Sequence, residues 1–324
     1  MSFKLYLFRS SADNVDITEM CSQVKWKGRK GSASRSLTVK LIDDDSESHA
    51  RSKIDVEQGH KCALYSDGKE LFQGIIMGTT QTDKKVLSFT AYDMGIYLSN
   101  NKDTFVYENK TADEIFRDVC ARFNLPVANV DKCSHRIPEL SKSSTTAFDV
   151  IADALSLDFD NTGARHYIMA DKGKLSLITR RKNILQYILS SEENILSYSL
   201  NKSIEKTKTR VKMLSDENKV LATAKNSGLE SKIGIFQDVA RPDETLNQAQ
   251  IQQLANTKLR EQGRVEKTIS ADVLGDPQII SGVGVFVQIP YLSINGTYYV
   301  DEDTHTWDGD SYKLSVKLNY TFDS

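Results

Sequence analysis

Apolar residues stand at every second position along several short stretches near the start of the chain, and this alternation constrains the fold more than any other feature. It is clear in Phe3–Leu7 and in Leu37–Leu41, and Gly74–Gly78 and Val86–Tyr92 are typical of two further strands. A period of two places one set of side chains on one face of a β-strand. Many short strands at this spacing predict a small antiparallel barrel or sandwich.

A tight turn is expected between two of these strands. The segment Ser66–Lys69 separates Leu64-Tyr65 from Glu70-Leu71-Phe72 and has Asp67-Gly68 at its centre. An Asp-Gly pair accepts the positive φ angles that a two-residue hairpin loop requires. The sequence therefore predicts a β-hairpin here.

The periodicity becomes helical after about residue 104. Thr111–Glu114 has the form of a capping box, in which the first and fourth residues satisfy backbone N–H groups at the start of a helix. An apolar stripe at helical spacing follows and stops before Pro126. The stripe consists of Ile115, Phe116, Val119, Cys120 and Phe123.

A second helix and a hairpin are expected next. Ser144 or Thr145 can cap a helix whose apolar residues recur at intervals of three and four from Phe148 to Leu155. Two alternating stretches then flank Asp171–Gly173, which is typical of a hairpin turn. Two helices and a hairpin predict a small α+β module.

The two-residue period returns near Ser197 and continues to the end of the chain, interrupted by one helix. Ile251 and Leu259 bound the apolar stripe of that helix, and Arg260 and Gly263 mark its end. The last strands are expected at 265–273, 283–289, 297–300 and 312–322. The predicted fold class is mainly β with an α+β module, divided into domains at 1–103, 104–196 and 197–324.

The balance of charge excludes one class of function. The 324 residues carry 42 Lys and Arg against 44 Asp and Glu, which leaves a net charge of −2. A surface that coats nucleic acid needs a large basic excess, so we expect no sequence-specific nucleic-acid binding. No apolar run approaches a membrane span, and the start Met-Ser-Phe-Lys lacks the apolar core of a signal peptide. We expect synthesis in a cytoplasm.

No motif for catalysis or for a cofactor is found. The chain has no GxSxG, HExxH, GxxxxGK[ST] or dinucleotide fingerprint, and Gly282-Val283-Gly284 runs into a strand where the fingerprint needs a helix. The expectation is no catalytic, cofactor-binding or metal-binding residue, and no enzymatic activity. The cysteines are expected to be buried thiols and the histidines isolated residues: Cys21, Cys62, Cys120, Cys133, His49, His60, His135, His166 and His305.

Two acidic runs and one basic strand are the main charge features. Asp43-Asp44-Asp45 with Glu47, and Asp301-Glu302-Asp303, are expected to be polar loop ends, because neither has the pattern of a calcium loop. From Lys206 to Lys212 every second residue is basic. This face either protects an edge strand from aggregation, or meets an acidic partner or an aqueous lumen through which a polyanion passes.

Three stretches of the chain follow one another in a distinctive order. The first is Leu71–Ile76 with the strand that closes on Ala91–Leu98, and the second is Thr111–Ile115. The third is a helix ending in Leu259–Arg264, a strand, and then Gly275–Gly282, which has the pattern Gly-Asp-Pro-x-x-x-x-Gly. Pro277 fixes φ and the flanking glycines permit sharp turns, so this segment is expected to form a barrel corner.

In this order, the three stretches resemble baseplate hub proteins of contractile phage tails, in the late-control D-like family. The resemblance implies an architecture and a set of partners. It implies two tail-tube-like β-barrel domains flanking the α+β module, in a non-enzymatic homotrimer that joins a six-fold tail tube to a three-fold central spike. Further partners would be the tube-initiator protein, other baseplate proteins and a tape-measure protein, in a virion or a tail-like bacteriocin particle assembled in the bacterial cytoplasm. The alternative is a tail-associated protein that binds or cleaves peptidoglycan, because the α+β module is distantly similar to LysM-type modules.

Overall fold

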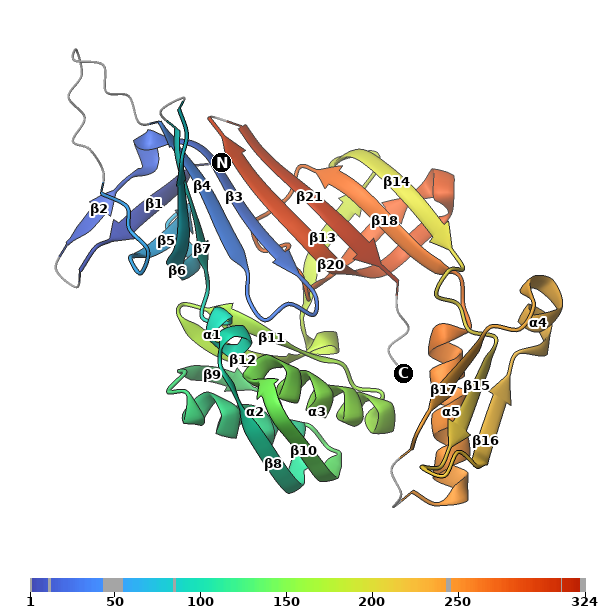
Figure 1. Ribbon diagram of the computed structural model, residues 1–324. Coiled ribbons are helices and arrows are strands. Elements are labelled where there is room, and N and C mark those ends of the chain that lie inside the picture. The colour runs from blue at the N-terminus through green and yellow to red at the C-terminus, as the bar shows by residue number, and fades with distance from the viewer. Residues whose placement is uncertain are drawn as a thin grey trace, which may run out of the picture.

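The computed structural model describes residues 2–10, 13–42, 55–83, 86–242, 246–309 and 311–320, and it is mainly β, as predicted (Figure 1). Strands from both ends of the chain form one 13-stranded sheet. Its N-terminal strands are β1 (Phe3–Phe8), β2 (Asn14–Asp16), β3 (Cys21–Arg29), β4 (Ser36–Ile42), β5 (Lys61–Ser66), β6 (Lys69–Gln81) and β7 (Val86–Tyr92). Its C-terminal strands are β13 (Ile184–Ser190), β14 (Ile195–Ser203), β18 (Glu266–Val273), β19 (Gly284–Ile289), β20 (Ile294–Asp308) and β21 (Ser311–Asn319).

Neither predicted barrel closes in the described part of the chain. The strands follow the order β14-β18-β21-β20-β3-β4-β7-β6-β5-β1-β2, and β13 joins through β19 to β20. In Figure 1 the blue strands near the N-terminus therefore lie directly beside the red strands near the C-terminus. The two β regions were expected to be separate domains, but they share one continuous sheet.

The long strand β20 makes this junction. Its first half, Ile294–Tyr299, pairs with β19, and its second half, Glu302–Asp308, pairs antiparallel with β3. β21 runs along its other side. Trp26 of β3 lies opposite His305, and their rings are 4.9 Å apart. Packing of these two aromatic rings therefore stabilises the boundary between the two β regions.

The hairpin predicted at the start of the chain is confirmed. Residues Lys61–Ser66 and Lys69–Gln81 pair antiparallel around the Asp-Gly turn. Asp67 and Gly68 have φ values of 47° and 78°. Both lie in the left-handed region that such a turn demands.

The α+β module contains the two predicted helices and the predicted hairpin. Its elements are α1 (Ile96–Asn100), β8 (Lys102–Thr111), α2 (Ala112–Arg122), β9 (Val127–Val130), β10 (Arg136–Thr146), α3 (Ala147–Thr162), β11 (His166–Asp171) and β12 (Lys174–Thr179). The capping box is confirmed: the backbone N–H of Thr111 donates to the Glu114 carboxylate at 3.1 Å. The cap of α3 is Thr146, not Ser144 or Thr145, because β10 extends to that residue and the Thr146 hydroxyl accepts from Asp149 N–H at 3.0 Å.

A second small module interrupts the C-terminal strands and was not expected. It consists of β15 (Arg210–Leu214), β16 (Val220–Lys225), α4 (Ser227–Ile233), β17 (Gln237–Ala240) and α5 (Gln248–Gln262). Its strands form their own sheet in the order β16-β15-β17. Val211, Met213, Ile251 and Ala255 form a separate core between this sheet and α5. The predicted helix with its end at Gly263 is confirmed, but it packs here and not on the large sheet.

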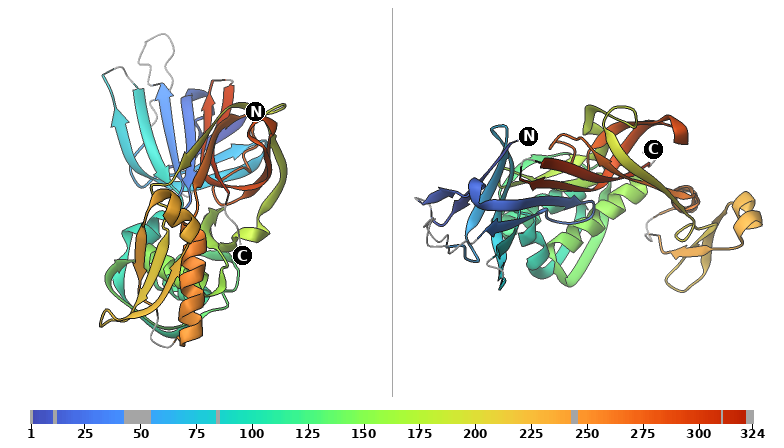
Figure 2. Two further views of the ribbon diagram at one scale, coloured as in Figure 1. Left: turned by 90° about the vertical axis from the view of Figure 1, so that its right-hand side faces the viewer. Right: turned by 90° about the horizontal axis from the view of Figure 1, so that it is seen from above.

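Both modules lie near one end of the strands of the large sheet (Figures 1 and 2). They contact each other through two ion pairs, Arg165–Glu261 at 2.7 Å and Lys258–Asp160 at 2.8 Å. Residues 184–190, which the predicted domain bounds of 104–196 place in the α+β module, form β13 and pair with β19 in the large sheet. Among the described residues, no helix combines the length and the apolar character that crossing a lipid bilayer requires.

Candidate functional site

One face of the large sheet is polar from β14 to β7, across both β regions. Cross-strand partners on this face continue from one strand to the next without a break at the β3–β20 junction. One row runs through Ser197, Asp272, Ser315, Thr304, Lys27, Ser36 and Tyr92. A second row runs through Lys313, Thr306, Lys25, Thr38 and Thr90. We call this surface the polar sheet face.

The polar sheet face has a basic excess, although the chain as a whole is slightly acidic. Its described basic residues are Lys25, Lys27, Arg29, Lys40, Lys313 and Lys317, and its described acidic residues are Glu266, Asp272, Glu302 and Asp308. Two of the acidic residues are in ion pairs: Glu302 with Lys317 at 2.8 Å, and Asp272 with Lys313 at 2.9 Å. Within the described residues Lys25, Lys27 and Lys40 have no such partner, so the face carries free positive charge.

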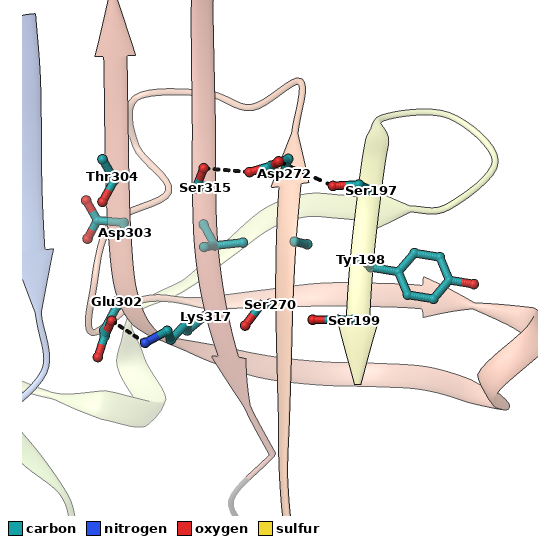
Figure 3. A pocket seen from close by; sticks show the side chains of 12 residues that line it. Ser197, Tyr198, Ser199, Ser270, Asp272, Glu302, Asp303, Thr304, Ser315 and Lys317 are labelled. Carbon is teal, nitrogen blue, oxygen red and sulfur yellow. Dashed lines mark hydrogen bonds and ion pairs between the residues drawn. The ribbon is translucent and has the colours of Figure 1, made fainter. Parts of the chain in front are cut away.

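A shallow pocket of about 350 Å³ lies on this face between β14, β18, β21 and β20 (Figure 3). Asp272 is at its upper end, where it accepts hydrogen bonds from Ser315 at 2.6 Å and from Ser197 at 3.3 Å. These hydrogen bonds and Lys313 hold the pKa of Asp272 below its ordinary value. The pocket is lined by hydroxyl and charged groups, which keeps this part of the sheet hydrated.

Behind the polar sheet face, a buried polar network fastens the two β regions together. The guanidinium of Arg35 donates to both carboxylate oxygens of Asp303, at 2.9 Å to Oδ1, and to the hydroxyl of Ser281 at 3.1 Å. The backbone N–H of Ser281 also donates to Asp303. Nε2 of His305 lies 3.3 Å from Asp303, and its Nδ1 lies 2.8 Å from the Tyr312 hydroxyl.

The charges of this network are almost fully shielded from water. The Asp303 side chain is 0% exposed and that of Arg35 is 10% exposed. Burial alone would raise the pKa of Asp303, but Arg35 and His305 outweigh it and hold this pKa far below its ordinary value. Arg35 comes from the N-terminal region and Asp303 from the C-terminal region, so their pair fixes one region against the other.

Gly28 leaves the room that Arg35 needs. A Cβ atom at this position would lie 1.8 Å from Nη1 of Arg35 and 2.6 Å from Oγ of Ser281. The same guanidinium lies over the Trp26 ring, 4.1 Å from its centroid. It therefore cannot shift to make room for a Cβ atom at position 28. Only glycine fits at this point of β3.

We expect Gly28→Ala to lower the free energy of unfolding by about 1–3 kcal/mol, because the new methyl group overpacks the network. Chemical denaturation monitored by tryptophan fluorescence measures this change. The matched control is Gly78→Ala, since a Cβ there meets nothing within 4 Å. An equal loss of stability in the two variants would show that a methyl group at position 28 does not overpack the network around Arg35.

His305 predicts an acid-sensitive component of stability. Its burial lowers its pKa below the ordinary value of 6.5, although Asp303 acts in the opposite direction. As the pH falls below about 6.5, the unfolded chain binds a proton that the folded chain does not, so stability is lost on acidification. Between pH 7 and pH 5 the free energy of unfolding should fall more steeply in the wild type than in His305→Gln. Parallel pH curves for the two proteins would contradict this.

The acidic run Asp301–Asp303 was expected to be a loop end, and this is wrong. All three residues belong to β20, and Asp303 points to the interior because a strand alternates its side chains. Gly275–Gly282 is indeed a connection between strands, and Ser281 in it reaches Arg35. The other acidic run, Asp43–Asp45 with Glu47, lies outside the described residues, as does His49.

In the segment Lys206–Lys212, Thr207, Thr209 and Val211 are buried between the basic residues, as predicted. The strand is shorter than predicted, because β15 begins at Arg210 and Lys206 and Lys208 precede it. β15 is the central strand of its sheet, so protection of an exposed edge does not explain the charges. Arg210 is occupied by an ion pair with Glu230 at 2.9 Å. Lys206, Lys208 and Lys212 are in no ion pair among the described residues, so this segment carries as many unpaired basic residues as the polar sheet face.

The predicted buried thiols are confirmed for Cys62, Cys120 and Cys133, while Cys21 is partly exposed. All four are free. Burial, helped by Asp158 and Asp113, raises the pKa of Cys133 to about 12, so it is protonated at neutral pH. The fold brings this thiol close to His166, a contact that no regular spacing in the sequence indicates.

Residues 24–319 match the model of the YqbQ-like family. The chain belongs to this family. It is 32% identical to the phage-like element PBSX protein XkdQ of Bacillus subtilis, over 92% of either chain. The fold is similar to that of the 43 kDa tail protein of prophage MuSo2 from Shewanella oneidensis, with a TM-score of 0.74, 13% identity and 97% of both chains covered.

A second similar structure extends the comparison beyond phages. The E. coli c3393 protein, a component of the type VI secretion system, matches with a TM-score of 0.57 and 10% identity, over 93% of this chain and 74% of its own. Together, the YqbQ-like sequence and the tail-protein fold support the prediction of a phage tail protein. The hub position and the trimer stay predictions.

Proposed function

We propose that this YqbQ-like protein is the baseplate hub of a contractile phage tail or of a tail-like particle. Three copies form a non-enzymatic adaptor that joins the six-fold tail tube to the three-fold central spike. Each chain contributes two β regions, so three chains contribute six, and this number matches the symmetry of the tube. The adaptor works through geometry and needs no catalytic residue.

The observation that carries this proposal is the continuous sheet through β3 and β20. An adaptor between two symmetries must hold the two β regions of each chain in a fixed relative orientation. A flexible linker would allow the six β regions of the trimer to change their relative positions. Seven consecutive residue pairs across the junction, from Glu302↔Arg29 to Asp308↔Gln23, and the buried Arg35–Asp303 pair supply that rigidity. This fits a part that transmits position and force between tube and spike.

The polar sheet face supports a role in lining a channel. A tail tube holds water and passes a polyanion, so its wall must be hydrated and must not repel negative charge. The hydroxyl groups and the free charges of Lys25, Lys27 and Lys40 meet both requirements. In this arrangement the modules near the strand ends face away from the channel, where other baseplate proteins can bind them.

Partners follow from this position in the particle. The tube or tube-initiator protein binds above the hub, the spike binds below it, and the tape-measure protein ends at the channel. The E. coli c3393 protein is itself structurally similar to the T4 bacteriophage tail proteins gp27 and gp5, and this similarity supports a place within the tail. Assembly takes place in the bacterial cytoplasm.

Immunogold electron microscopy of particles from producing cells tests the proposal. We expect label confined to the baseplate end of the tail. Label along the whole tube, or no label on intact and disrupted particles when the epitope is accessible, would contradict a hub. In parallel, pelleting with purified cell walls and a turbidity assay on wall fragments examine the competing peptidoglycan function. We expect neither binding nor cleavage by the isolated chain.

A further inference from the structure

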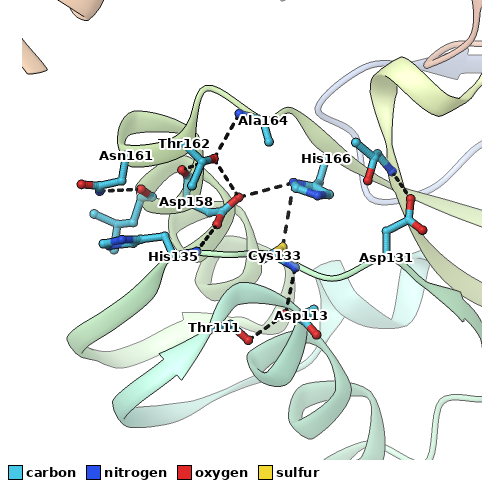
Figure 4. A network of polar contacts seen from close by, with 12 residues as sticks. Thr111, Asp113, Asp131, Cys133, His135, Asp158, Asn161, Thr162, Ala164 and His166 are labelled. Carbon is cyan, nitrogen blue, oxygen red and sulfur yellow. Dashed lines mark hydrogen bonds and ion pairs between the residues drawn. The ribbon is translucent and has the colours of Figure 1, made fainter. Parts of the chain in front are cut away.

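Three side chains from separate elements meet inside the α+β module (Figure 4). Cys133 comes from the loop between β9 and β10, Asp158 from α3, and His166 from the start of β11. Nδ1 of His166 lies 3.9 Å from Sγ of Cys133 and 3.6 Å from Oδ2 of Asp158. One ligand atom from each residue lies within 4.8 Å of the others. The side chains of Asp158 and His166 are 0% and 2% exposed.

Direct hydrogen bonding explains only part of this cluster: Sγ of Cys133 is within hydrogen-bonding distance of Nδ1 of His166, but the carboxylate of Asp158 is not. A separation of 3.6 Å between an imidazole nitrogen and a carboxylate oxygen is too long for a hydrogen bond, although both groups are buried and would gain from a closer approach. A nucleophilic triad is excluded as well, because such a triad uses the two opposite nitrogens of the imidazole. Here the thiol and the carboxylate both approach the same nitrogen, Nδ1.

The three groups are held in position by neighbouring atoms. Asp158 accepts a hydrogen bond from the backbone N–H of His135 at 3.0 Å and another from the Thr162 hydroxyl at 3.4 Å. The backbone N–H of Cys133 donates to Asp113 at 3.1 Å. Supporting bonds of this kind orient the ligands of metal sites.

The surroundings favour a cation. Asp113 and Asp131 lie close enough to act electrostatically on His166, in addition to Asp158. Lys182, the nearby cation, is exposed and pairs with Asp131 at 3.3 Å. A buried carboxylate needs a compensating positive charge, and no Lys or Arg among the described residues forms an ion pair with Asp158. A divalent ion would supply that charge.

We propose that Cys133, Asp158 and His166 bind one zinc ion. The set of one sulfur, one nitrogen and one oxygen suits zinc, whereas magnesium and calcium prefer oxygen ligands alone. Zinc bonds of about 2.0–2.3 Å place neighbouring ligand atoms of a tetrahedron about 3.5 Å apart, close to the 3.6 and 3.9 Å found. Cys133 loses its proton when the ion binds, and water occupies the fourth position.

The ion has a structural role that goes beyond the proposed hub function. It connects the 131–135 loop, α3 and β11, in addition to the hydrogen bond by which His135 N–H of the loop contacts Asp158 of α3. His166 is flanked by Arg165, which pairs with Glu261 of the second module, and by Tyr167, which packs against Gly282 in the connection between β18 and β19. Zinc would therefore fix one of the segments through which the α+β module contacts its neighbours.

Metal analysis of the purified full chain tests the site. After dialysis with zinc and removal of loosely bound ions, we expect one zinc per chain and a higher temperature of unfolding than in the chelated protein. Replacement of zinc by cobalt should produce a thiolate-to-cobalt charge-transfer band. Cys133→Ala should weaken zinc binding at least about tenfold and abolish the band. The matched control, Cys120→Ala, removes a buried thiol of the same module that is not part of the cluster and should keep both.

Two results would overturn the proposal. One is the absence of retained zinc in the folded wild-type chain, and the other is equal zinc retention by Cys133→Ala and the wild type. If Cys133→Ala does not fold, the cobalt spectrum of the wild type decides, because a bound cobalt ion without a thiolate band excludes Cys133 as a ligand. His166→Gln provides a second variant, with the thiol intact and zinc binding expected to be lost.

Discussion

Replacing Asp303 by asparagine is expected to lower the free energy of unfolding by about 3–5 kcal/mol. The substitution keeps the shape of the side chain but leaves the buried guanidinium of Arg35 without its counter-charge. A loss of this size is a large fraction of the roughly 5–15 kcal/mol by which a domain is typically stable. Urea denaturation, followed by the fluorescence of Trp26 and Trp307 at the junction of the two β regions, measures the effect.

The control is Glu302→Gln, one residue earlier in the same strand. Glu302 forms its ion pair with Lys317 at the surface, so the expected loss is at most about 1 kcal/mol. A double substitution, Arg35→Met with Asp303→Leu, should be more stable than Asp303→Asn, because it removes both buried charges together. Similar losses for Asp303→Asn and Glu302→Gln would mean that the buried pair does not hold the β regions together.

Reversing the charge of the polar sheet face is expected to lower the activity of assembled particles about tenfold or more. The change replaces Lys25, Lys27 and Lys40 by glutamate, which converts a wall that attracts a polyanion into one that repels it. These side chains point away from the core, so stability should change by about 0.5 kcal/mol or less for each substitution. Infectious or killing units per mass of assembled particles, together with the unfolding curve of the isolated chain, measure the two effects.

An equal charge change elsewhere serves as the control. Lys206, Lys212 and Lys225 belong to the second module or its entry and can be replaced by glutamate in the same way. We expect these particles to keep most of their activity. If the two triple variants lose activity equally, the polar sheet face has no special role. The basic segment Lys206–Lys212 would then be an equally good candidate for contact with a polyanion.

Local features of the fold were predictable because their causes lie within a few residues. The Asp67-Gly68 turn and the Thr111 capping box depend on the chemistry of neighbouring positions, and both are confirmed. The pairing of β3 with β20 depends on residues more than 270 positions apart, and alternation alone does not specify partners. The two β regions were therefore predicted as separate barrels.

The functional residues could not be predicted from the sequence for a related reason. Three consecutive acidic residues at 301–303 are typical of a loop, and only the fold reveals that Asp303 faces Arg35. Cys133, Asp158 and His166 have no regular spacing, because a loop, a helix and a strand each supply one of them. The one local signal was Gly28 within an otherwise regular strand, which can indicate the close approach of another group.

The junction of β3 with β20 has a consequence for the synthesis of the protein. β3 leaves the ribosome early, but its partner is made about 270 residues later, which takes on the order of tens of seconds at typical rates of translation. During that time the edge of β3 and the side of Trp26 are uncovered in the nascent chain. Native folding of the sheet therefore waits until β20 has been made, and chains terminated before β20 carry an open strand edge that favours aggregation.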